Sequence, residues 1–256
     1  SVKDVEGVKN VATVLSETGH ENTVVVISAM GKTTNALEGV VEAYFKQPQT
    51  FKSALADVEV FHQHIIEELF EAPNTAVSKR VRNLFEQCLI FLANNRSPHE
   101  AFVYDQVVNF GELISTSIVC AYLNHVGIAA EWVDARTCIK TDNFYRSAHL
   151  DWERTQLAIQ NQVQGSVLKI TQGFIGSDDN NFTTTLGREG SDYSAAIFAY
   201  CLGATDVTIW KDVPGVLNAD PRVFDKTQLL HHISYHEAIE LAFYGASVIH
   251  PKTLQP

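Results

Sequence analysis

The residues with the clearest chemical potential lie in a glycine turn followed by the start of a helix, within residues 183–202. Gly187 and Gly190 flank Arg188 after a β-branched run, and Ser191 begins an apolar, alanine-rich segment. A strand, a glycine turn and a helix N-terminus in that order form an anion site, because free backbone N–H groups and the helix dipole point at one place. Arg188 adds a planar, permanently charged fork that matches a carboxylate or a phosphate.

Other charged side chains are expected near the same place. Lys211 and Asp212 follow the next predicted strand, residues 205–210, and loops at the carboxyl ends of neighbouring parallel strands share one crevice. Ser191 and Asp192 each have an ordinary structural explanation, as a helix N-cap and as a charge that complements the helix dipole. Their expected meeting with Lys211 and Asp212 in one crevice favours a site for a charged ligand.

Glu112 is the third candidate. Gly111-Glu112 falls in the first turn of a helix predicted at 109–125, whose other turns are mostly apolar. Two interpretations stay open on the sequence alone. The glutamate either complements the helix dipole, or its carboxylate binds the ammonium group of a substrate.

Alternating β-branched and amphipathic segments predict the elements that position these residues. Strands are expected at 23–28, 128–133, 167–172, 182–186 and 205–210. Helices are expected at 1–18, 35–45, 51–70, 76–93, 109–125, 152–163, 191–202 and 234–243. The two long helices at 51–70 and 76–93 are expected to form a helical insertion, about 51–93, outside the main sheet. The pattern predicts an α/β fold, a three-layer αβα sandwich with a mainly parallel central sheet.

Composition argues against several classes of protein. The chain has 256 residues, 45% of them hydrophobic, and a formal net charge of −11, which allows a large core and argues against nucleic acid or an anionic membrane as the main partner. No apolar run approaches the roughly 20 residues of a membrane helix, and nothing at the start resembles a signal peptide. We therefore expect a cytoplasmic protein with no membrane partner.

Cysteine and histidine spacing, and the known phosphate-binding fingerprints, narrow the chemistry further. The four cysteines are expected as buried free thiols, and the ten histidines show no metal-site spacing. Gly31-Lys32-Thr33 resembles the end of a P-loop, but the first glycine of that motif would fall at Val26. The dinucleotide fingerprint G-x-G-x-x-G is absent, which argues against a dehydrogenase.

Taken in order, the motifs of this chain resemble those of the aspartate kinases of the amino acid kinase family. Seven motifs carry the resemblance: Val26-Ile27-Ser28-Ala29-Met30, Gly111-Glu112, Gly173-Phe174, Leu186-Gly187-Arg188-Glu189-Gly190-Ser191-Asp192, Asp212-Val213-Pro214-Gly215-Val216, Asp220-Pro221-Arg222 and Gly245-Ala246-Ser247-Val248-Ile249-His250-Pro251. One such motif would be weak, whereas seven in the family's order along residues 1–256 are specific. The resemblance implies the amino acid kinase fold.

The resemblance also implies a reaction, in which MgATP phosphorylates the β-carboxylate of L-aspartate to 4-phospho-L-aspartate. This is the first step of lysine, threonine and methionine biosynthesis, and ATP and Mg²⁺ would be the cofactors. A carboxylate nucleophile is already ionised at neutral pH, so no general base is needed. Catalysis then consists of alignment and of screening the charge on the transferring phosphoryl group.

The roles implied by the family fall on two sides of a crevice. Arg188 would bind a carboxylate of aspartate as a bidentate pair, Glu112 would bind its ammonium, and Arg188 and Asp192 are the catalytic candidates. The amino-acid pocket would comprise Ser28, Thr34, Glu112, Phe174, Arg188, Ser191 and Asp192. The nucleotide side would comprise Lys211, Asp212, Pro214, Leu217, Asp220, Arg222 and Lys252. No resident metal site is expected in the protein, because Mg²⁺ would arrive with the nucleotide.

The chain departs from the family at several places. Family members begin with a strand ending Lys-Phe-Gly-Gly-Thr-Ser, and Ser1 matches that serine, so we expect a kinase domain at 1–256 that is truncated at both ends. The expected homodimer would use ACT domains that follow the kinase domain in relatives. Leu217 stands where many members have tyrosine. Ser247 stands where many have lysine, a contact that Lys252 would replace.

Two alternatives stay open. The first is another kinase of the same fold, acting on glutamate, acetylglutamate, carbamate or UMP, against which the Ser191-Asp192 turn and Glu112 argue. The second is a non-catalytic ligand-binding module on this scaffold, which the missing lysine and the helical insertion favour.

Overall fold

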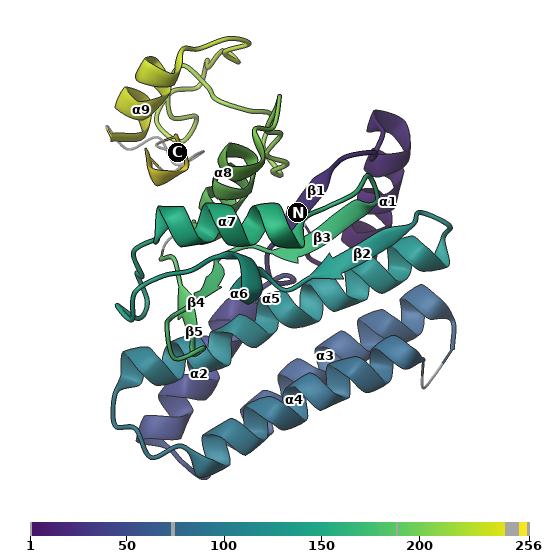
Figure 1. Cartoon of the computed structure of the whole chain (residues 1–256), viewed down its shortest axis with the longest axis vertical. Helices are drawn as coiled ribbons and strands as arrows, with labels where there is room; N and C mark the ends of the chain where they lie inside the picture. Colours follow the sequence, from purple (N-terminus) through teal and green to yellow (C-terminus); the bar gives the residue numbers. More distant parts are fainter. Residues whose placement is uncertain (1, 73–74, 188, 244–250, 255–256) are drawn as a thin grey trace.

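The computed structural model describes residues 2–72, 75–187, 189–243 and 251–254 (Figure 1). A three-stranded parallel sheet lies at its centre, formed by β1 (Val24–Ile27), β2 (Ala130–Val133) and β3 (Leu168–Gln172) in the order β1-β3-β2. Helices cover both faces of this sheet, which confirms the predicted αβα arrangement. The sheet is mainly β-branched and aliphatic because its central strand β3 is buried along its whole length.

The pleat of β1 shows how the sheet separates two hydrophobic cores. Val25 and Ile27 pack into the larger core, whereas Val24 and Val26 pack into the smaller one. Successive side chains of a strand point to opposite faces. A continuous run of valine and isoleucine is therefore what a strand covered on both sides requires.

Four helices build the layer under one face of the sheet. α5 (Glu100–His125) runs along the sheet, α2 (Thr33–Lys46) packs beside it, and α3 (Phe51–Phe70) and α4 (Ala76–Asn94) form an outer pair. Figure 1 shows α5 between the sheet and this pair. The two helices predicted for the insertion are present, and their inner faces belong to the larger core.

The opposite face is covered by α8 (Gly190–Leu202), on which α7 (Trp152–Gln162) packs. The smaller core contains Cys138, Ile139, Ile159, Leu186, Ile197, Phe198 and Cys201. α1 (Val5–Thr18) packs against α3 and α5, and α6 (Ala135–Cys138) is a single turn after β2. All four cysteines are buried and unpaired, as predicted.

The remaining elements are small. β4 (Ile175–Ser177) and β5 (Thr183–Thr185) form an antiparallel pair beside the main sheet; the sequence indicated β5 but not β4. α9 (Tyr235–Phe243) begins with the predicted capping box, in which the Ser234 N–H and hydroxyl donate to Glu237. The single 3₁₀ turn η1 (Pro251–Leu254) packs on α8 and α9.

Two predicted elements are wrong. The helix expected at 109–125 begins at Glu100, so Glu112 lies in its middle and not in its first turn. The strand expected at 205–210 does not form, and Val207 and Trp210 are 49% and 62% exposed. A strand needs a neighbour for its backbone hydrogen bonds, and within the described part of the chain this segment pairs with none.

α5 is the one described helix with the length and apolarity to cross a membrane. In this fold 83% of its most hydropathic window is buried inside the protein. Burial of that kind is typical of the core helix of a globular domain.

Candidate active site

Glu112 anchors one side of the site. Its side chain is 2% exposed, and Oε1 accepts a hydrogen bond of 3.3 Å from the Ala29 N–H in the loop after β1. Oε2 is buried and has no hydrogen-bond partner among the described residues. Glycine at position 111 permits this approach, because a Cβ there would lie 2.9 Å from the Ala29 Cβ.

Burial determines the charge state of this carboxylate. Removal from water raises the pKa of Glu112 to about 8, and the Ala29 N–H opposes the rise only in part. A helix dipole acts mainly within the first turn, so the mid-helix position of Glu112 removes the dipole interpretation. A buried carboxylate with one open oxygen is suited to a cationic partner such as an ammonium group.

The end of β3 and the start of α8 interlock on the other side of the site. A Cβ at Gly173 would lie 2.5 Å from the Ser191 Cβ, and one at Gly190 would lie 2.7 Å from the Phe174 Cδ2. Phe174 has a φ of 69°, in the left-handed region that is costly for a side chain of this size. Glycines at 173 and 190 are therefore required by close approach and not by flexibility.

Ser194 holds the strained Phe174 in place, and sequence reasoning missed it. Its Oγ accepts a hydrogen bond of 2.9 Å from the Phe174 N–H and donates one of 2.9 Å to the Gly190 carbonyl. Ser194 lies one turn after the Gly-Ser start of α8. A fully buried serine at this spacing in an apolar helix was the available signal.

The first turn of α8 differs in detail from the prediction. The helix begins at Gly190, and the capping position belongs to Glu189, which has a φ of 54° and makes no side-chain cap. Ser191 is therefore inside the helix and is not its N-cap. Arg188 lies outside the described residues.

Asp192 and Lys211 meet as predicted. The Lys211 Nζ lies 2.7 Å from the Asp192 Oδ2, and the side chains are 26% and 17% exposed. This ion pair brings the loop after α8 back to the helix start, although no strand forms at 205–210. Ser28 is exposed at the end of β1, and Thr34 is half-buried in the first turn of α2, close in sequence to the Ala29 contact with Glu112.

A buried network of hydrogen bonds links the backbone of Glu112 to the end of β3. The Gln172 side chain donates 2.8 Å to the Thr116 Oγ1, and the Thr116 hydroxyl donates 2.8 Å to the backbone carbonyl of Glu112. Gln172 also accepts 2.8 Å from the Ala135 N–H. The network fixes α5 to the end of β3, beside Phe174. Sequence reasoning missed it, and the polar Gln172 at the end of an aliphatic strand was its signal.

Asp105 ties a second loop to β5. Its two oxygens each lie 3.1 Å from the Arg146 N–H, and they also accept 2.8 Å bonds from the N–H and hydroxyl of Thr185. Desolvation outweighs these donors and raises the pKa of Asp105 to about 7. Only Leu186 separates Thr185 from Gly187. A Cβ at Gly187 would lie 3.4 Å from the carbonyl oxygen of Arg146. Asp105 thus positions the strand that leads into the glycine turn.

The other residues predicted for the nucleotide side do not cluster around the Asp192–Lys211 pair in the described contacts. Leu217 pairs with Leu229 in an isolated antiparallel bridge, and Asp212 and Pro214 are exposed. Arg222 binds the Asp220 carboxylate with Nε and Nη2, the latter at 2.7 Å, which lowers the pKa of Asp220 to about 2. The described contacts of Asp220 and Arg222 thus join them mainly to each other. Lys252 lies in η1, which packs on α8.

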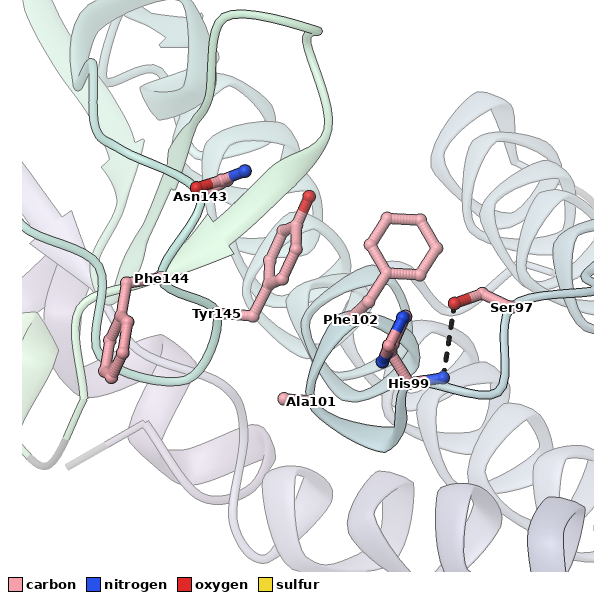
Figure 2. A pocket seen from close by; sticks show the side chains of 7 residues that line it. All are labelled: Ser97, His99, Ala101, Phe102, Asn143, Phe144 and Tyr145. Carbon is pink, nitrogen blue, oxygen red and sulfur yellow. Dashed lines mark hydrogen bonds between the residues drawn. The ribbon is translucent and has the colours of Figure 1, made fainter.

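A separate cavity of about 560 Å³ lies at the start of α5 (Figure 2). It is lined by Ser97, His99, Ala101, Phe102, Asn143, Phe144 and Tyr145. None of these residues belongs to the candidate site. Within the described ranges there is also no group of three or more His, Cys, Asp or Glu side chains arranged to hold a metal ion.

Comparisons with known proteins agree with this geometry. Residues 1–256 match the amino acid kinase family. The chain is 34% identical to the lysine-sensitive aspartokinase 3 of Escherichia coli, over 91% of the chain and 51% of that protein, and 33% identical to aspartokinase 1 of Arabidopsis thaliana, over 100% and 46%. The chain therefore spans about half the length of the curated relatives it matches.

Comparison with solved structures also finds an aspartokinase. The crystal structure of E. coli aspartokinase III in complex with aspartate and ADP, in its R-state, superposes with a TM-score of 0.89 at 33% identity, covering 100% of this chain and 57% of that one. The T-state structure of the same enzyme, with lysine and aspartate, gives a TM-score of 0.87 at 32% identity over 99% of this chain and 57% of that one.

Proposed function

Because this chain belongs to the amino acid kinase family, we propose that the protein transfers the γ-phosphoryl group of ATP to the β-carboxylate of L-aspartate. The observation that carries the proposal is the Glu112 carboxylate, buried beside the loop after β1 with one oxygen unpartnered among the described residues. The likeness to a structure that holds aspartate and ADP supports it. The product would be 4-phospho-L-aspartate.

The amino-acid side would be formed by Glu112 on α5, the loop after β1 and the start of α8. Glu112 would bind the substrate ammonium, which would supply Oε2 with the partner it lacks among the described residues. Arg188 would bind a carboxylate of aspartate next to the N-terminus of α8. The interlocked Gly173-Phe174 and Gly190-Ser191 segments would fix the distance between these two grips.

The nucleotide side would lie around Lys211, beyond its ion pair with Asp192. The ion pair holds Lys211 at the first turn of α8, where it would screen charge on the transferring phosphoryl group. Mg²⁺ bound to the ATP phosphates would neutralise further charge. Asp212, Pro214, Leu217, Asp220, Arg222 and Lys252 remain the proposed nucleotide contacts.

The wider setting is also part of the proposal. Aspartate phosphorylation begins lysine, threonine and methionine biosynthesis, and the protein would act in the cytoplasm as a homodimer. The names of two relatives, an aspartokinase sensitive to lysine and a chloroplastic aspartokinase, support a biosynthetic role.

The test is a substrate panel with MgATP, in which ADP release measures turnover on every acceptor and the acyl phosphate formed from aspartate is trapped as a hydroxamate. Aspartate should be the best acceptor among aspartate, glutamate, acetylglutamate, carbamate and UMP. Arg188→Ala should raise the aspartate KM by about 100-fold and leave the ATP KM within about threefold. Preference for another acceptor would assign a different kinase of this fold, whereas binding without turnover would assign a ligand-binding module.

A further inference from the structure

His62 is a fully buried histidine on α3, in the outer helix pair, and it contacts the start of α2, just after the loop that follows β1. Its Nδ1 lies 2.7 Å from the Val58 carbonyl and its Nε2 lies 3.3 Å from the Thr33 Oγ1. A carbonyl only accepts, so Nδ1 carries the proton and Nε2 is the acceptor. The Thr33 hydroxyl therefore donates to His62.

Thr33 connects this bond to the site. It is the first residue of α2 and is 3% exposed. The Thr33 Cγ2 lies 3.3 Å from where a Cβ would stand at Gly111, directly before Glu112. The loop that joins β1 to α2 is thus fastened by two side chains, Glu112 at Ala29 and His62 at Thr33.

We infer that His62 is a positioning residue for the amino-acid site, which holds Thr33 and hence the loop of residues 28–34 against Glu112. This inference rests on the proposed function, because that loop carries Ser28 and Thr34. It also gives the outer helix pair a role beyond packing.

An ordinary core role explains less. Phe61 and Phe85 pack against the imidazole with ring centroids 5.0 and 5.8 Å away, so an aromatic hydrocarbon would fill this space without a polar atom. The histidine instead uses both nitrogens. Burial lowers the pKa of His62 to about 4, which keeps the ring neutral and Nε2 an acceptor at physiological pH.

Four variants separate positioning from packing. His62→Phe keeps the ring and removes the acceptor, and should raise the aspartate KM about tenfold with kcat and the ATP KM within about twofold. His62→Gln, whose amide oxygen can accept from Thr33, should restore most of the affinity. Thr33→Val removes the donor and keeps the β-branched shape, so it should match His62→Phe. The double variant should show no further rise.

His64→Phe is the matched control, because His64 lies on the solvent side of the same helix and pairs with Glu68 at 2.7 Å. Hydrogen exchange without substrate tests directly whether the His62–Thr33 hydrogen bond holds the loop. Amides of residues 28–34 should exchange faster in His62→Phe and not in His64→Phe. Equal rises in both KM values, or unchanged exchange at 28–34, would overturn the role. A wild-type protein that does not phosphorylate aspartate would refute the proposed function separately, and the exchange measurement would still decide the role of His62.

Discussion

Two buried carboxylates on α5, those of Asp105 and Glu112, differ in how far the protein satisfies their hydrogen bonds. Asp105 accepts from the Arg146 N–H and from both donors of Thr185, so its oxygens are occupied by the protein itself. Glu112 accepts one bond and keeps Oε2 unpartnered within the described residues. Burial of an unsatisfied carboxylate is costly. The saturated group therefore serves structure, and the unsaturated one is suited to a ligand.

Aspartate binding should depend on pH through Glu112. Its pKa is raised to about 8 in the empty site, and an ammonium prefers the ionised form, so binding below pH 8 must release a proton. The association constant should rise about tenfold per pH unit from pH 6 to about 8 and then level. Calorimetry in buffers of different ionisation enthalpy measures both affinity and proton release. Glu112→Gln should bind weakly and without this slope, and a flat wild-type profile would contradict the assignment.

Asp105→Asn should destabilise the protein without touching the substrate. The amide keeps one acceptor oxygen, while its NH₂ group faces N–H donors, so we expect a loss of about 2–4 kcal/mol in the free energy of unfolding at pH 8. Because the pKa of Asp105 is raised from 3.8 to about 7, the wild type loses unfolding free energy at this group as pH rises from about 4 to 7. Denaturant titrations should show that slope reduced in the variant. An unchanged midpoint at pH 8 would refute the role of Asp105 as a tie.

At the scale of elements, the sequence correctly predicted the helices and strands whose residues show a clear local hydrophobic pattern. The valines of β1 and the spacing of α3 and α4 predicted those elements closely. The start of α5 was placed too late because Asp105 and Gln106 are polar, although both are buried by bonds to β5. Those bonds span about 80 residues, and no local pattern reveals them.

In the candidate site, too, local motifs were predicted and long-range contacts were missed. The Gly-Ser turn and the Asp192–Lys211 pair were predicted from motifs and from the rule that neighbouring loops share a crevice. Gln172, Ser194 and His62 were missed because each acts through a contact with a residue distant in the sequence. A polar residue within an apolar segment marks such positions without naming the partner.

Gly173→Ala should disrupt the junction of β3 and α8. The new Cβ would lie 2.5 Å from the Ser191 Cβ and 2.6 Å from its Cα, so backbone must move, at a cost of about 1–3 kcal/mol of unfolding free energy. The aspartate KM should rise while the ATP KM changes less. Gly39→Ala in α2 is the control: nothing lies within 4 Å of its new Cβ, and it should stabilise by about 0.5–1 kcal/mol. Equal stability of the two variants would refute the close approach.

At the scale of the whole molecule, burial is uneven along the chain. The two cores contain residues from α1 to α8, whereas residues 203–234 form only an isolated bridge and turns. Trp210, Phe224 and Tyr235 are 62%, 57% and 78% exposed. Sparse backbone pairing with exposed aromatic side chains marks a part of the protein that opens at low free energy.

Limited chymotrypsin digestion should therefore cut first after Trp210, Phe224 or Tyr235, and leave a fragment that contains α1 to α8. Phe198 is a matched aromatic in α8 at 1% exposure, and it should survive until the protein unfolds. If this segment forms the nucleotide side, MgATP should slow the first cuts several-fold while aspartate alone has a smaller effect. Mass spectrometry of the early fragments measures this order. Early cleavage at Phe198, or protection by aspartate and not by MgATP, would place the nucleotide elsewhere.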